Sequence, residues 1–133
     1  MYRKSYTGLV VSMCIFFALV MIIPFLPGAD VQVSMRLILL VTAWYMAALT
    51  LHVWRTEQVY WYNGISFEEA EAAGSERRKE FAWKHVKMFG MVALILTAVS
   101  CGTYLLGWSA WIDFFVGMAG IIVAACCTIP FKL

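Results

Sequence analysis

The chain has 133 residues, of which 63% are hydrophobic and only 14% are charged, with a mean hydropathy of +0.81. A domain of this length cannot bury so much apolar surface in its own core, so the composition excludes an ordinary water-soluble globular protein. The formal net charge of +2 gives no reason to expect a nucleic-acid partner. The length predicts a single domain.

Four apolar stretches account for most of the chain. They lie at about 6–25, 31–53, 86–106 and 109–129, and the charged segment 54–87 separates the first pair from the second. A hydrocarbon core about 30 Å thick requires about 20 helical residues to cross, so each stretch is long enough to span a membrane. We therefore predict an all-α polytopic membrane protein, in which residues 1–133 form one antiparallel bundle of four transmembrane helices.

The basic residues are distributed unevenly between the two sides of such a bundle. If the four spans alternate in direction, Arg36 lies on one side and the other nine of the 10 Lys and Arg residues lie on the other. Because positively charged loops stay on the cytoplasmic side, we predict that both termini and the segment 54–87 are cytoplasmic. The expected location is the plasma membrane, which in a bacterium is the inner membrane.

The stop signals in the segment 54–87 predict that the second and third helices extend beyond the membrane. Between positions 52 and 62 there is no Gly or Pro, so we expect the second helix to cover 31–62 and to end at Asn63-Gly64. The third helix is expected to cover 75–106 after a break at Gly74. Together the two helices would form a cytoplasmic helical hairpin.

A shorter helix is expected at the turn of this hairpin. Ser66 and Glu69 have the spacing of a capping box, which predicts a helix over 67–73. Trp54 and Trp83 would lie level on the two stems and could pack together, although aromatic residues at this depth are also typical of a headgroup belt. If the hairpin binds a partner, the candidate interaction surface consists of Arg77, Arg78, Lys79, Trp54 and Trp83.

Two charged residues, Arg36 and Asp113, lie well inside the predicted spans, whereas Lys87 lies at the edge of the span at 86–106. Arg36 lies more than one turn inside the second helix, and Asp113 lies about one turn inside the fourth, at similar depth near the outer surface. One interpretation is that Arg36 extends to the headgroups while Asp113 favours the start of its helix. The other interpretation, which we test below, is an ion pair beside an outward-facing cavity, because either charge alone in lipid is costly.

The two histidines would also lie level in the predicted hairpin, at the cytoplasmic boundary. His52 and His85 are therefore candidate ligands of a haem or a metal, or candidate proton carriers. They are weak candidates, because level residues need not face each other and the short metal-binding motifs are absent. We expect neither a cofactor nor a bound metal.

The sequence contains no motif of an established catalytic site. It has no Gly-x-Ser-x-Gly, no phosphate-binding glycine loop and no carboxylate cluster within a span, so we do not expect an enzyme. The size and the span count resemble those of the small multidrug resistance transporters, but the span at 6–25 lacks the membrane glutamate that this family carries in its first helix.

We therefore expect an accessory, regulatory or immunity-type membrane subunit that acts through helix packing and its cytoplasmic hairpin. Its partners would be the lipid bilayer and either another membrane protein or further copies of this chain. The alternative is a homo-oligomeric transporter or channel for ions or small molecules, with Arg36 and Asp113 near its outer mouth.

Overall fold

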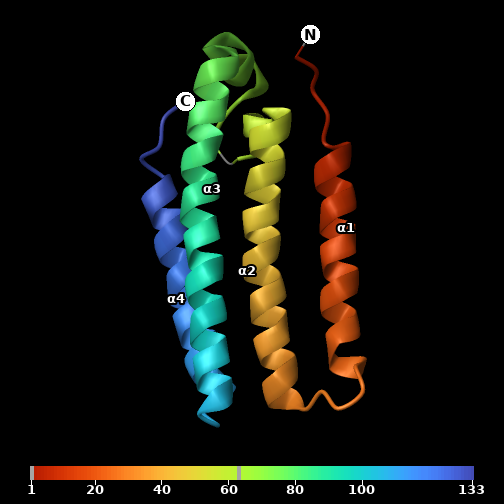
Figure 1. The fold of residues 1–133 in the computed structure, drawn as a ribbon. Helices are drawn as coiled ribbons and strands as arrows, with labels where there is room; N and C mark the ends of the chain where they lie inside the picture. Colours follow the sequence, from red (N-terminus) through yellow and green to blue (C-terminus); the bar gives the residue numbers. More distant parts are fainter. Residues whose placement is uncertain (1, 63) are drawn as a thin grey trace.

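The computed structural model describes residues 2–62 and 64–133, and these residues are all-helical. Four of the helices are long and apolar enough to cross a membrane, which confirms this part of the prediction. They lie side by side, with both chain termini at the same end of the molecule (Figure 1). The elements are α1 (Thr7–Ile22), η1 (Ile23–Phe25), α2 (Val31–Thr56), η2 (Val59–Trp61), α3 (Phe67–Leu105) and α4 (Ala110–Thr128).

Helix α2 ends earlier than the sequence pattern predicts. It stops at Thr56, and Glu57 adopts a left-handed conformation with a φ of 59°. A non-glycine residue in this conformation ends a helix, and here the Glu57 side chain holds the chain in place through bonds described below. The prediction of one helix over 31–62 is therefore wrong. A 3₁₀ turn, η2, forms near the end of this range instead. Asn63, the predicted stop, lies outside the described residues.

Helix α3 is bent near its start, where the sequence predicts a break. Gly74 has φ 77° and ψ 163°, which are not helical values, so the short stretch before it and the long stretch after it are two helices that meet at a bend. The expected capping box is present: Ser66 Oγ accepts from the Glu69 amide, and the Glu69 carboxylate accepts from the Ser66 amide.

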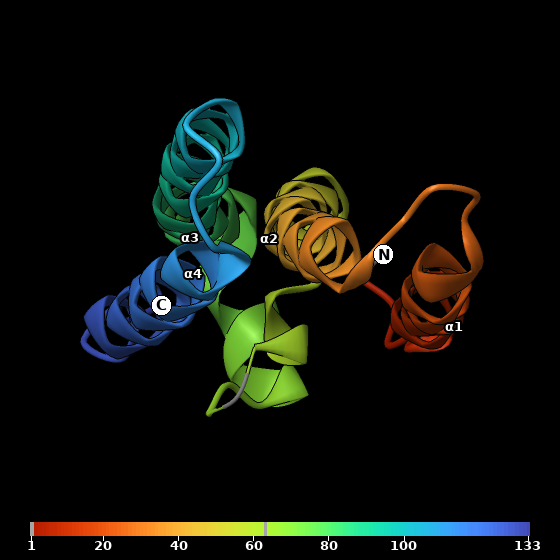
Figure 2. The ribbon, with the colours of Figure 1, turned by 90° about the horizontal axis from the view of Figure 1, so that it is seen from below.

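Three helices pack closely and the fourth lies apart. Viewed along the helix axes, α2, α3 and α4 form a group, and α1 stands beside α2 alone (Figure 2). Gly117 permits the close contact of α4, because a Cβ at this position would lie 3.3 Å from the Leu96 side chain of α3. Helix α1 has no buried residue, and most of its apolar side chains are exposed and suit a lipid environment.

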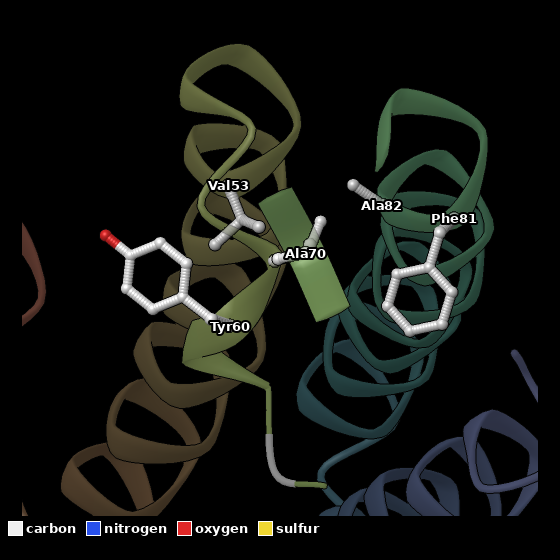
Figure 3. Packing of buried hydrophobic residues seen from close by; sticks show 6 residues of the cluster. Val53, Tyr60, Ala70, Phe81 and Ala82 are labelled. Atoms are coloured by element: carbon white, nitrogen blue, oxygen red, sulfur yellow. The ribbon is translucent and has the colours of Figure 1, made fainter. Parts of the chain in front are cut away.

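A second core lies at the end of the molecule that carries the termini. We call this end the tip, defined as residues 53–62 and 64–83. Val53 and Tyr60 gather around Ala70 from one side, and Phe81 and Ala82 of α3 contact the same cluster from the other (Figure 3). The tip therefore has a packed interior of its own. The opposite end, which we call the distal end, consists of residues 30–36 and 103–113.

Candidate functional site

The distal end contains an ion pair between two buried residues. Arg36 Nε lies 2.7 Å from Asp113 Oδ2, and the two residues are 8% and 0% exposed. The structure thus brings together the two charged residues that the sequence places at equal depth. Asp113 lies in the first turn of α4, where the partial positive charge of the helix N-terminus also stabilises a carboxylate.

Further polar groups complete the surroundings of this pair. Thr103 Oγ1 donates to Asp113 Oδ1 over 2.6 Å, and Arg36 Nη2 donates to the Trp108 carbonyl. Nearby, the Gln32 side chain accepts from the Ala110 amide over 2.6 Å. These bonds connect α2, α3, α4 and the α3–α4 turn, and each carboxylate oxygen of Asp113 has a partner. The arrangement can hold three helices together at the distal end.

The same geometry bears on the hypothesis of an outward-facing cavity. A pocket of about 280 Å³ between α2 and α3 is lined by Arg36, Ser100 and Tyr104, together with apolar side chains. Asp113 is not among the residues that line it. In the described part of the chain, the two charges therefore do not share a cavity, and the carboxylate is closed off from solvent.

We predict that removing one charge of this pair destabilises the protein strongly. Asp113→Asn leaves the Arg36 guanidinium buried without a counter-charge, which is expected to cost about 3–5 kcal/mol in the free energy of unfolding. Replacing Arg36→Met in the same molecule should recover most of that loss. The free energies of unfolding of the single and the double variant are measured by reversible unfolding in mixed micelles, followed by circular dichroism. A double variant as unstable as Asp113→Asn would contradict the interpretation that the two charges act as a pair.

At the tip, a second charged cluster is centred on Glu57. The Glu57 carboxylate accepts from Arg78 Nη2 over 2.7 Å and from Ser75 Oγ over 2.7 Å, and Lys79 Nζ lies 3.4 Å away. Arg78 also donates to the carbonyl of Ala70 over 3.0 Å. The carboxylate thus connects the end of α2 to α3 just after its bend. Partial burial raises the pKa of Glu57, but the bonds from Ser75 and Arg78 outweigh it and hold the pKa below its usual range.

The N-terminal segment is attached to this cluster. The Tyr2 hydroxyl donates to the Glu57 carbonyl over 2.7 Å, and the Arg78 guanidinium lies 4.1 Å from the Tyr2 ring centroid. Burial raises the pKa of Tyr2 to about 12 in spite of the nearby Arg78 charge, so the phenol stays protonated and donates at neutral pH. Farther along, the Ser5 carbonyl accepts from Tyr60 and Trp61. The segment before α1 is therefore fixed to the tip.

The candidate interaction surface divides into buried and exposed residues. Arg78 is only 8% exposed and is bound to Glu57, so its inclusion in that surface is corrected: it stabilises the tip and is not free to bind a partner. Arg77 and Lys79 are exposed on the same helix. Trp54 and Trp83 pack together as predicted, with ring centroids 5.3 Å apart, and Trp83 is 41% exposed.

The two histidines lie in different surroundings. His52 of α2 is exposed and stacks on Trp61 with centroids 5.5 Å apart, beside Gly8 of α1. His85 of α3 is buried and stacks on Tyr62 with centroids 4.2 Å apart. They therefore do not form a shared ligand pair. Among residues 2–62 and 64–133 there is no group of three or more His, Cys, Asp or Glu placed to hold a metal ion.

Sequence reasoning missed Glu57 because no local pattern identifies it. Its partner Arg78 lies 21 residues away in the chain. Only the folding of the tip brings them together.

We predict that the Glu57 cluster is lost in acid. Because the folded-state pKa lies below the unfolded value of about 4.5, the stabilisation is fully present above that value and disappears as the pH falls through the folded-state pKa. The amide NMR signals of residues 74–80 should therefore move with a midpoint below 4.5. Glu57→Gln should abolish this transition, whereas Glu80→Gln, which removes only an exposed pair with Lys84, should leave it in place. An unchanged transition in Glu57→Gln would contradict the assignment.

No protein-family model, curated protein or solved structure matches this chain. We therefore infer the function from the geometry of the two charged clusters and the surfaces around them.

Proposed function

We propose that the protein is a multi-pass plasma-membrane protein, with successive helices antiparallel and with the tip and both termini in the cytoplasm. The uneven distribution of Lys and Arg supports this orientation. The position of both termini beside the tip agrees with it (Figure 1). Because α2 ends at Thr56, the cytoplasmic hairpin pairs a short stem from α2 with a longer one from α3.

The proposed activity is that of a non-catalytic accessory, regulatory or immunity-type subunit, which acts on another membrane protein through the tip. The observation that carries the proposal is the contrast between the two ends of the molecule. At the distal end, the charges of Arg36 and Asp113 are buried and satisfied by each other and by their neighbours. At the tip, exposed cations surround a well-packed interior.

The exposed part of the tip has the chemistry of a protein-binding surface. Trp83 offers a large, partly exposed aromatic ring that packs against Trp54. Lys87 Nζ lies 6.0 Å from the centroid of the Trp83 ring. Lys79 lies about one turn before Trp83 on α3, and Arg77 is a further exposed cation of the same helix. Aromatic residues and Arg are enriched in interface cores, and positive charge favours a partner with an acidic segment at the inner membrane surface. Arg78 and Glu57 hold this surface in shape.

We predict that the tip forms a specific contact in native membranes. A photoreactive benzoylphenylalanine at position 83 should give one discrete cross-linked product that is larger than this chain alone. The same group at position 44, where Trp44 is exposed midway along α2, should not give this product. Combining Arg77→Glu with Lys79→Gln should reduce the yield about tenfold, because charge complementarity guides docking.

Two controls separate binding from folding. Arg3→Glu reverses an exposed charge outside the tip and should leave the yield unchanged, and the unfolding midpoint of the Arg77 and Lys79 variant should match that of the wild type. A product made of two copies of this chain would favour the homo-oligomer. Absence of any product at position 83, with the wild-type protein folded, would contradict the proposal.

A transporter or channel is the second candidate, and one observation favours it. Arg36 lines the pocket of about 280 Å³ together with Ser100, whose buried hydroxyl has no hydrogen-bond partner in the described chain. A polar group of this kind inside a membrane protein can belong to a solute path. Loss of function in an Arg36 variant that still folds, with normal function in the Arg77 and Lys79 variant, would favour this candidate over the accessory role.

The orientation is tested by chemical labelling. In a chain with all four cysteines replaced by Ala, Leu106→Cys should react with a membrane-impermeant maleimide added to intact cells, because it lies at the outer end of α3. Glu76→Cys should react only after the membrane is permeabilised, because it lies at the tip. Labelling of Glu76→Cys from outside intact cells would overturn the proposed orientation.

A further inference from the structure

The largest cavity described in the molecule lies beneath the tip, between α2, α3 and α4. It has a volume of about 790 Å³, within the range of small-molecule sites, and is separate from both charged clusters. The end of α4 and the residues after it form one wall, and α2, η2 and α3 form the others. Its lining is mainly apolar and aromatic, and includes Trp61, Tyr62, Phe81, His85, Phe89 and Phe131.

His85 lines this cavity and has one ring nitrogen without a hydrogen bond to the described residues. The residue is 6% exposed, and its Nδ1 lies 3.1 Å from the Phe81 carbonyl. A carbonyl only accepts hydrogen bonds, so Nδ1 carries the proton and donates. Burial among aromatic rings favours the neutral imidazole, which leaves a lone pair on Nε2. Nε2 has no hydrogen bond to any described residue, so it is an unused acceptor.

Tyr62 lines the same cavity and carries an unused donor. Its ring is stacked on His85 at an interplanar angle of 13°, and its hydroxyl is buried without a hydrogen-bond partner in the described chain. Burial raises the pKa of Tyr62, so the hydroxyl keeps its proton. The two threonines of the lining do not compensate, because Thr50 and Thr128 donate to carbonyls of their own helices over 2.8 and 2.7 Å.

The remaining lining restricts the charge of a ligand. None of the described residues that line the cavity carries a formal charge. An ionised headgroup would therefore lose its hydration without gaining a counter-charge. A neutral hydroxyl fits instead, because it can donate to His85 Nε2 and accept from the Tyr62 hydroxyl at the same time. The apolar walls formed by Phe89 and the α4 side chains suit a hydrocarbon body.

We propose that this cavity binds an uncharged amphiphile whose polar end carries a hydroxyl group. Two membrane compounds have this chemistry, a neutral glycerolipid and a quinol, and the experiment distinguishes them. The proposal is independent of the accessory role, because it concerns a small molecule and a different set of residues.

The experiment follows His85 Nε2 directly by ¹⁵N NMR of the full chain in phosphatidylcholine nanodiscs. The chain contains two histidines, so His52 serves as an internal control. The probes are monooleoylglycerol, a decyl-substituted benzoquinol and methyl oleate, which has the same acyl chain as the first but no hydroxyl. We expect one of the two hydroxyl-bearing probes to shift the His85 Nε2 signal in a saturable way. His52 should not shift with any probe, and methyl oleate should not shift His85.

Two variants test which atoms bind. His85→Phe keeps an aromatic ring and removes the acceptor, and should weaken binding about fivefold, as expected for one hydrogen bond. Tyr62→Phe should weaken binding by a similar factor while leaving the unfolding midpoint unchanged or higher, because it removes a buried hydroxyl that has no partner. His52→Phe should bind as the wild type does. Affinity for these variants is measured by the saturation of a fluorescent analogue of the probe that shifts His85.

The proposal is overturned if neither hydroxyl-bearing probe shifts His85 Nε2. It is also overturned if methyl oleate produces the same shift, or if His85→Phe and Tyr62→Phe bind as tightly as the wild type. A purely structural role for Tyr62 would lower stability in Tyr62→Phe without changing affinity, which is the opposite of the expected result.

Discussion

The burial of one opposite-charge pair among apolar helices is the constraint on which the packing of this molecule depends. Asp113 is inaccessible to solvent, so α4 can pack against α2 and α3 only where Arg36 and Thr103 meet its carboxylate. Apolar contacts between membrane helices are not selective, because lipid tails offer similar contacts. The polar bonds therefore select one register for three helices, and small residues such as Gly117 then allow the close approach.

The sequence predicts well those features that depend on composition and on depth. The four spans follow from the length of the apolar runs, and the capping box at Ser66 follows from a local pattern. The equal depth of Arg36 and Asp113 suggests their pairing, because counting residues along each helix gives a height along the helix axis. Each of these features depends only on the order of residues along the chain and on the number of residues counted along a helix.

Features that depend on the direction in which side chains point could not be predicted in the same way. His52 and His85 are level in the sequence pattern, yet His52 stacks on Trp61 and His85 stacks on Tyr62, so they do not meet. Arg78 belongs to a run of charged residues that the sequence predicts to be exposed. It is buried, because its guanidinium is bound to the Glu57 carboxylate. The end of α2 at Thr56 has the same cause, because the left-handed Glu57 is held by residues of another helix, and tertiary contacts here override a run with no Gly or Pro.

The tip also explains how α1, which buries none of its own residues, keeps a defined position. Its attachment lies before the helix, where the Ser5 carbonyl accepts from Tyr60 and Trp61. Trp61 stacks on His52 on the α1 side and also lines the large cavity on the other. One indole thus contacts the N-terminal segment, the surface between α1 and α2, and the proposed ligand site. The Trp61 indole supplies one of the hydrogen bonds that fix the segment before α1 to the tip, beside those made by Tyr2 and Tyr60. The proposed ligand site and the attachment of α1 therefore share a side chain, so the position of the Trp61 ring affects both.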